Sequence, residues 1–224
     1  MEISERIKQV KSGLPASVKL VAVSKTKPNE DIMEAYRAGQ KSFGENKVQD
    51  LALKYEELPK DIEWHLIGHL QTNKVKFIAP FVSMIHAIDS LKLLMVIDKE
   101  AKKAGRVIPC LLQFHIAEEE TKFGLNQKEA VELLSSDEFK NATNVRIAGV
   151  MGMATFTDDT VQVRREFAGL KSTFEILKAK FFANDDSFCE ISMGMSDDYR
   201  IAVQEGSTMV RIGSVIFGAR NYQV

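Results

Sequence analysis

Short apolar runs alternate regularly with amphipathic stretches along the 224 residues of this chain, and this alternation limits the possible folds more than any other feature. The apolar runs are near-continuous and rich in Val and Ile, which is typical of parallel strands buried on both faces. We expect strands over residues 18–24, 41–44, 62–67, 84–88, 108–114, 145–150, 188–191 and 208–211. We expect helices over residues 1–15, 28–38, 45–58, 73–79, 90–105, 126–135, 158–181 and 197–204. Eight strands alternate with eight helices, of which the first is an extra helix before the first strand. This pattern predicts an α/β fold of the closed (β/α)8 barrel type.

A single domain over residues 1–224 is the expected organisation. Barrels commonly occupy roughly 200–250 residues, and no linker or low-complexity stretch interrupts the alternation. The alternative architecture is an open doubly wound sheet, which normally has a glycine-rich turn after its first strand. Residues 24–27, Ser-Lys-Thr-Lys, contain no glycine, so the barrel is favoured.

Charge and composition narrow the choice of partners. The chain has 30 basic and 31 acidic side chains, which is no surplus for binding nucleic acid. Its apolar runs have the length of strands, and the first residues lack the apolar core of a signal peptide. We therefore expect a cytoplasmic protein without a membrane segment.

The cysteines and histidines do not indicate a metal or redox centre. Cys110 and Cys189 each lie in an apolar run, so both are expected as buried, reduced thiols. His65 and His69 are four residues apart, but Gly68 separates them after a strand, which fits a helical metal pair poorly. No metal is expected.

The first predicted strand ends at a lysine, where a barrel keeps its chemistry. Lys25 follows the apolar run, and Pro28 then opens a helix. Apolar walls at such a position disfavour an ammonium ion and favour a neutral amine that attacks an aldehyde. An ordinary role at the rim is the alternative for Lys25. Lys27 competes with it but is expected to face outward beside Pro28, in contact with solvent.

The loops after the seventh and eighth strands are where barrels most often bind phosphate. They carry hydroxyls and glycines at Ser192, Ser196, Gly213 and Ser214, whose amides suit an anion if a short helix starts there. A simple turn role is the alternative.

Arg211 ends the last strand. We expect its guanidinium to point toward the ring of a bound ligand. Because a guanidinium cannot accept a proton from a pyridine nitrogen, such a ring would stay neutral.

Five stretches of this sequence together resemble the pyridoxal phosphate homeostasis protein family, which is related to the N-terminal barrel of alanine racemase. They are residues 22–28, 43–46, 64–74, 192–197 and 211–218. The resemblance extends in order over essentially the whole chain. It implies a fold-type III barrel that holds pyridoxal 5'-phosphate (PLP) as a Schiff base and controls the supply of the free cofactor.

The resemblance also assigns roles to residues. It implies that Lys25 bears the Schiff base, that Arg211 faces the pyridine nitrogen, and that Ser196, Gly213 and Ser214 bind the phosphate. Two positions depart from the racemase pattern: Met153 stands where an imidazole covers the ring, and Lys122 stands where an arginine reaches the phenolate oxygen. Asn46 and His65 are expected at the edge of the pocket, with packing or turn roles as the alternative.

We expect a PLP carrier in vitamin B6 homeostasis rather than an enzyme. Racemases of this fold use a tyrosine from a second domain, and the sequence ends at Val224, soon after Gly218. Tyr199 and Tyr222 are the only tyrosines near the expected pocket. The carrier is expected to be a monomer that hands PLP to apo-enzymes. The alternatives are a small PLP-dependent amino-acid racemase and a scaffold in which PLP is only structural.

Overall fold

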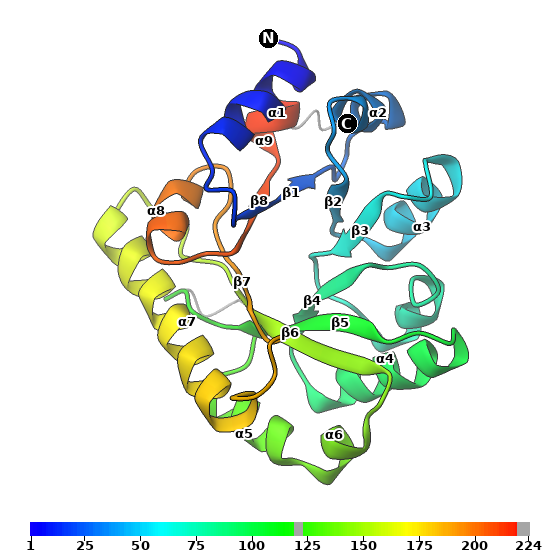
Figure 1. Ribbon diagram of the computed structural model, residues 1–224, viewed down its shortest axis with the longest axis vertical. Helices are drawn as coiled ribbons and strands as arrows, with labels where there is room; N and C mark the ends of the chain where they lie inside the picture. Colours follow the sequence, from blue (N-terminus) through cyan, green and yellow to red (C-terminus); the bar gives the residue numbers. More distant parts are fainter. Residues whose placement is uncertain (119–122, 219–224) are drawn as a thin grey trace.

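Eight parallel strands close into a barrel where the first strand pairs with the last (Figure 1). The computed structural model describes residues 1–118 and 123–218. The strands are β1 (Lys19–Val23), β2 (Ser42–Glu45), β3 (Glu63–Leu66), β4 (Met84–Ile88), β5 (Ile108–Phe114), β6 (Val145–Gly152), β7 (Glu190–Ser192) and β8 (Met209–Ile212). Their order around the barrel is the order in the sequence. The predicted closed barrel is confirmed, and the open sheet is excluded.

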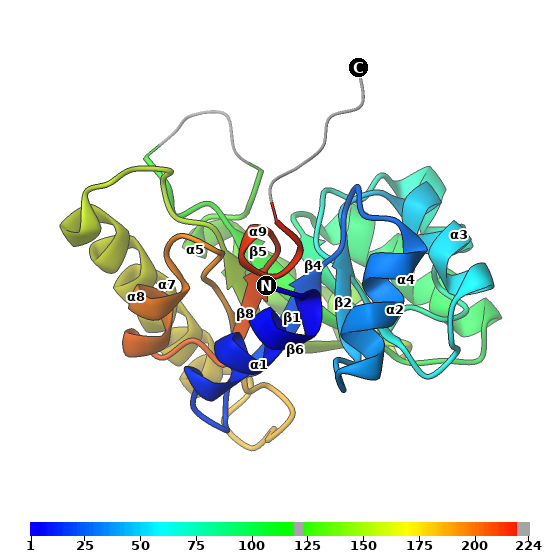
Figure 2. The ribbon, with the colours of Figure 1, turned by 90° about the horizontal axis from the view of Figure 1, so that it is seen from above.

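Helices cover the outside of the barrel (Figure 2). They are α1 (Ile3–Ser12), α2 (Asn29–Arg37), α3 (Val48–Glu57), α4 (Leu91–Lys103), α5 (Gln127–Ser135), α6 (Asp137–Asn141), α7 (Thr160–Phe181), α8 (Tyr199–Gln204) and α9 (Ser214–Phe217). The N-terminal helix α1 lies beside α9, where Arg6 Nη1 donates to the carbonyl of Ile216 at 3.3 Å. The first and last helices are therefore joined next to the closing pair of strands.

Two local predictions were wrong in detail. The helix expected over 73–79 is a 3-10 helix, η1 (Thr72–Phe77). Pro80 disfavours helical backbone at the residue before it, so this segment ends before an α-helix becomes established. The short helix α6 was not predicted. Ser136 caps it by accepting from the amide of Phe139 at 3.2 Å, directly after α5 ends.

The apolar side chains form two groups on opposite faces of the strands. One group fills the barrel itself and comprises Val21, Met84, Leu111, Ala148, Met151 and Met209. A much larger group, including Phe43, Trp64, Phe167 and Phe188, lies between the strands and the helices. Burial on both faces explains why the strands read as continuous apolar runs. Polar side chains also lie inside the barrel, among them His65, His86, Ser192 and Arg211, all of them buried.

The two cysteines differ in environment. Cys110 lies in β5 and is buried as predicted, and burial raises the pKa of its thiol. Cys189 is exposed, so the prediction of a second buried thiol was wrong. The strand β7 begins only at Glu190, one residue later. The amide of Cys189 donates to the carbonyl of Ala148 in β6 at 3.0 Å, but the residue as a whole stays exposed.

Neither a membrane segment nor a metal cluster is present in the described part of the chain. Within residues 1–118 and 123–218, none of the helices combines the length and the apolar character needed to cross a bilayer. The same residues contain no group of three or more His, Cys, Asp or Glu side chains placed to hold a metal ion.

Candidate functional site

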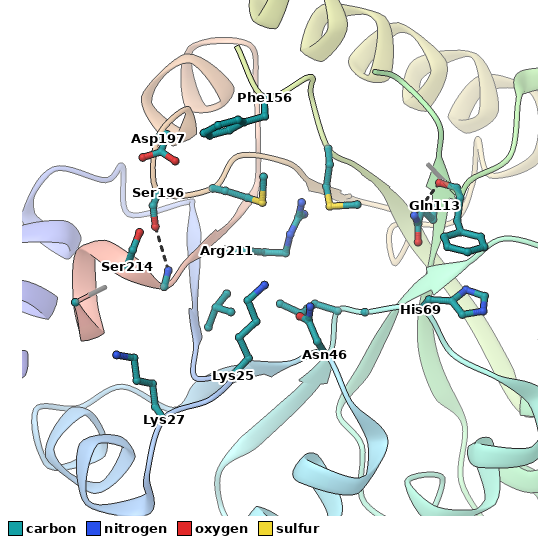
Figure 3. A pocket seen from close by; sticks show the side chains of 18 residues that line it. Lys25, Lys27, Asn46, His69, Gln113, Phe156, Ser196, Asp197, Arg211 and Ser214 are labelled. Atoms are coloured by element: carbon teal, nitrogen blue, oxygen red, sulfur yellow. Dashed lines mark hydrogen bonds between the residues drawn. The ribbon is translucent and has the colours of Figure 1, made fainter. Parts of the chain in front are cut away.

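A cavity of about 430 Å³ opens where the strands end. The seven residues that the sequence analysis proposed for cofactor binding all line it: Lys25, Asn46, Met153, Ser196, Arg211, Gly213 and Ser214. They come from the ends of β1, β2, β6, β7 and β8. Closure of the barrel brings together side chains that are as far apart in the sequence as Lys25 and Arg211 (Figure 3).

Lys25 lies in the tight turn between β1 and α2, as its position after an apolar run indicated. The amide of Lys27 donates to the carbonyl of Ser24 at 3.0 Å and closes this turn. Thr26 has a φ of 63°, a left-handed conformation that is unfavourable for a residue with a Cβ. Lys25 is half-buried, and its side chain extends into the middle of the cavity (Figure 3).

Lys27 does not face solvent, contrary to the sequence-based expectation. It is half-buried, lines the same cavity, and its Nζ donates to the carbonyl of Phe217 at 2.9 Å. Its side chain lies on the side of the cavity where Ser214 lies (Figure 3). The reason is the short helix α9, which ends over the β1 turn and offers Lys27 a carbonyl acceptor. Both lysines therefore remain candidates for reaction with an aldehyde.

Arg211 enters the cavity from β8 and is only 3% exposed. Its guanidinium donates to the carbonyl and hydroxyl of Ser192 at 2.8 and 2.6 Å, and to the carbonyl of Gly152 at 3.1 Å. Burial lowers the pKa of Arg211 to about 10, so it keeps its proton at neutral pH. A fixed, charged hydrogen-bond donor therefore lies at the base of the cavity.

Two predicted positions lie beneath the cavity instead of at its edge. Ser192 is the last residue of β7 and is fully buried, and its hydroxyl lies 3.1 Å from Nδ1 of His86. His65 lies in β3, where its Nδ1 is 2.9 Å from Nε2 of His86. Burial lowers the pKa of His65 to about 3, and burial beside His65 and Arg211 lowers that of His86 as well. Both imidazoles are therefore neutral and form a buried chain that ends at Arg211.

The loops after β7 and β8 meet on one side of the cavity. The amide of Gly213 donates to the hydroxyl of Ser196 at 3.2 Å (Figure 3). A Cβ on Gly213 would lie 3.2 Å from the carbonyl oxygen of Val23, so this glycine allows close packing of β8 against β1. The first donors within α9 are the amides of Ile216 and Phe217, which leaves the amides of Ser214 and Val215 outside the helix's own hydrogen bonds.

Several cavity residues were missed by the sequence analysis. They are Gln113, Phe123, Phe156, Met195 and Asp197, together with Ile67, Gly68 and His69. The rings of His69 and Phe123 stack with their centres 4.4 Å apart at the rim. Residues 67–69, Met195 and Asp197 lie within two of the stretches that carry the family resemblance, which could have indicated them. Tyr199 lies in α8 and is not among the residues that line the cavity, whereas Lys122 and Tyr222 fall outside the described residues.

Comparison with known proteins assigns the chain to a family. The model of the alanine racemase N-terminal domain matches residues 1–221. A pyridoxal phosphate homeostasis protein of Pasteurella multocida is 39% identical over 210 residues, which cover 92% of this chain and 88% of that protein. This chain belongs to the pyridoxal phosphate homeostasis protein family. The family suggested by the five sequence stretches is thereby confirmed.

Solved structures resemble this chain over almost its full length. PipY of Synechococcus elongatus, solved without PLP, has a TM-score of 0.90 and 35% identity, and the match covers 97% of this chain and all of PipY. A second structure of PipY, with PLP bound, has a TM-score of 0.87 at the same identity and coverage. Alanine racemase from Bartonella henselae has a TM-score of 0.75 at 16% identity, with 99% of this chain matching 63% of the racemase. That likeness concerns the fold alone.

Proposed function

We propose that this protein binds PLP in the cavity at the ends of the strands and acts in PLP homeostasis. The observation that carries the proposal is the meeting of Lys25, Arg211 and the Gly213–Ser214 loop around one cavity. Each group suits a different part of PLP: an amine for the aldehyde, a guanidinium for the ring nitrogen, and amides with hydroxyls for the phosphate. PipY, which is similar over its full length, has been solved with PLP bound.

The residues present fit this cofactor. A volume of about 430 Å³ lies within the range of roughly 300–1,000 Å³ that is usual for small-molecule sites. Lys25, Lys27 and Arg211 bring positive charge to the cavity, which complements a phosphorylated ligand, whereas Asp197 is the one acidic side chain among its described lining residues. At Gly213 a side chain would crowd Val23 at the end of β1, so the glycine lets the loop after β8 lie close to β1 beside the cavity.

The roles follow from the chemistry of the side chains. When bound, PLP would supply an aldehyde for reversible condensation with the neutral Nζ of Lys25, in which the carbonyl oxygen leaves as water. Arg211 can only donate, so it orients the ring nitrogen without accepting a proton from it. Ser196, Gly213 and Ser214 would hold the phosphate, Met153 would contact the ring, and Asn46 would orient one edge of it.

A carrier is the activity that we favour. A site that holds an aldehyde reversibly can limit its free concentration or release it to apo-enzymes, and we propose that this occurs in the cytoplasm with a monomeric protein. The match to the racemase domain model supports an amino-acid racemase as the second candidate. Following single amino-acid enantiomers for inversion, with Lys25→Ala as the blank, distinguishes the two activities.

Borohydride reduction tests the assignment of Lys25. Reduction of the PLP-treated protein should fix one phosphopyridoxyl group, which mass spectrometry of peptides locates. We expect Lys25→Ala to abolish this label and the absorbance of bound PLP, because the attacking amine is gone. Lys27→Ala is the matched control and should keep both. If Lys25→Ala retains the label while Lys27→Ala loses it, Lys27 is the reactive residue and our assignment is wrong.

A further inference from the structure

A buried ion pair lies directly behind the turn that carries Lys25. Nζ of Lys54, from α3, is 2.7 Å from Oε1 of Glu45, the last residue of β2. Glu45 is fully buried and Lys54 is 9% exposed. Burial raises the pKa of Glu45, and Lys54 opposes this rise. A buried pair often contributes little net stability, because the cost of desolvation offsets the attraction. Its presence here points to a role other than stability.

Ser24 connects this ion pair to β1. Its hydroxyl donates to Oε1 of Glu45 at 2.6 Å, and its carbonyl accepts from Nζ of Lys54 at 2.9 Å. Its amide donates to the carbonyl of Gly44 at 3.1 Å. Every polar group of Ser24 is thus engaged. Since Ser24 immediately precedes Lys25, the backbone at the start of the turn is held from three directions.

The same carbonyl also closes the turn itself. The carbonyl oxygen of Ser24 accepts from the amide of Lys27, and Lys25 and Thr26 are the two residues enclosed. The left-handed backbone of Thr26 is unfavourable for a residue with a Cβ. A strained turn of this kind persists when the surrounding contacts fix it. The bond from Lys54 is directed at the atom on which the turn depends.

We propose that Lys54, Glu45 and Ser24 are positioning residues that hold Lys25 in the cavity. The inference rests on the proposed function, in which Lys25 binds the cofactor. Neither Lys54 nor Glu45 lines the cavity, so they act through the backbone. Asn46, which does line the cavity, directly follows Glu45. One ion pair therefore ties together the two loops that follow β1 and β2.

The test must separate positioning from stability. Lys54→Met alone leaves the Glu45 carboxylate buried without its cation, which destabilises the fold whatever the role of the pair. The double variant Glu45→Gln/Lys54→Met removes both charges and keeps an acceptor for the Ser24 hydroxyl, but lacks the bond to the Ser24 carbonyl. Lys19→Met is the matched control, because Lys19 pairs with Glu63 at 2.8 Å at the opposite end of β1.

The measurement is the share of phosphopyridoxyl label on Lys25 relative to Lys27 after borohydride reduction at limiting PLP. This ratio compares two lysines in one molecule, so partial unfolding alone does not change it selectively. We expect the urea concentration at which the double variant unfolds to be close to that of wild type. We expect its Lys25 share to fall about tenfold, because this is the factor that one hydrogen bond from a charged group contributes. Lys19→Met should keep the wild-type ratio.

The outcomes are distinguishable. A folded double variant with the wild-type ratio overturns the positioning role. If the double variant does not fold, Ser24→Ala decides, since it removes a single hydrogen bond to Glu45: a lowered Lys25 share supports the proposal, and an unchanged share overturns it. Failure of the wild-type protein to take label at Lys25 refutes the proposed function itself, independently of the variants.

Discussion

Arg211 is a permanent cation inside a barrel, and its neighbours explain how it is accommodated. Its hydrogen bonds go to the oxygens of Ser192 and Gly152. The hydroxyl of Ser192 lies 3.1 Å from Nδ1 of His86, and Nε2 of His86 lies 2.9 Å from Nδ1 of His65. Each neutral imidazole has one donor and one acceptor nitrogen, so the hydrogen bonds along this chain all point the same way. Both histidines therefore carry their proton on the same ring nitrogen, either Nδ1 in both or Nε2 in both. The chain runs in one direction and fixes the orientation of the charged group.

At the residue scale, the sequence predicted what lies at strand ends but not what lies beneath them. Lys25 and Gly213 follow recognisable apolar runs, so their place on the cavity wall could be expected. The contact of His65 with His86 could not, since it depends on the register of β3 against β4 and on which face each strand turns inward. The exposure of Lys27 was misjudged for a related reason, because its acceptor belongs to α9, far along the sequence.

Replacement of Gly213 by valine tests the proposed phosphate site. The added side chain would crowd the carbonyl of Val23 and disturb the amide that donates to Ser196. We expect the affinity for PLP and pyridoxamine phosphate to fall at least about tenfold, because charge-assisted hydrogen bonds to the phosphate are lost. The affinity for unphosphorylated pyridoxal should change less than about threefold. Equal losses for all three ligands, measured by fluorescence titration, would contradict a phosphate site at Gly213.

At the element scale, an irregularity in β6 shapes one wall of the barrel. The pairing between β5 and β6 shifts by one residue, since Cys110 faces Ile147 whereas Leu111 faces Gly149. Gly149 has a φ of 153°, and a Cβ there would lie 1.8 Å from the carbonyl oxygen of Glu190. Strand and helix positions could be predicted from apolar periodicity, but this bulge could not, because it arises from contact between strands.

Two glycine substitutions compare this strand with a helix. Gly149→Ala should lower the free energy of unfolding by at least about 2 kcal/mol, because the methyl group collides with the backbone of β7. Gly169→Ala, in the exposed middle of α7 with open space around it, should raise that free energy by about 0.5–1 kcal/mol. Urea denaturation measures both. Equal effects would show that the bulge does not require glycine.

At the scale of the whole molecule, neutral histidines in the barrel make stability depend on pH. Burial holds the pKa of His65 at about 3 and that of His86 well below its usual value, whereas an unfolded histidine titrates near pH 6.5. The unfolded state therefore takes up protons between about pH 6.5 and 3 that the folded state does not. The free energy of unfolding should decrease as the pH is lowered through that window, by up to about 1.4 kcal/mol per pH unit for each histidine that stays neutral in the folded protein.

His86→Gln checks this dependence. The glutamine amide can still bond to both Ser192 and His65 but does not titrate. When the pH is lowered from about 6.5 to about 5, the free energy of unfolding of the variant should therefore decrease by about 2 kcal/mol less than that of wild type. Urea denaturation at the two pH values gives the difference. His115→Gln, at an exposed position, is the control for loss of an imidazole. A wild-type slope in His86→Gln would show that His86 is protonated in the folded protein.

The pairing of β1 with β8 has a consequence for synthesis on the ribosome. Lys25 lies in the turn that follows the first strand to be translated, whereas Arg211 lies in the last strand and Gly213 follows it. A nascent chain thus exposes its amine long before the guanidinium and the glycine loop exist to form the rest of the pocket. The cavity proposed to bind PLP is therefore complete only after β8 has been translated and has paired with β1.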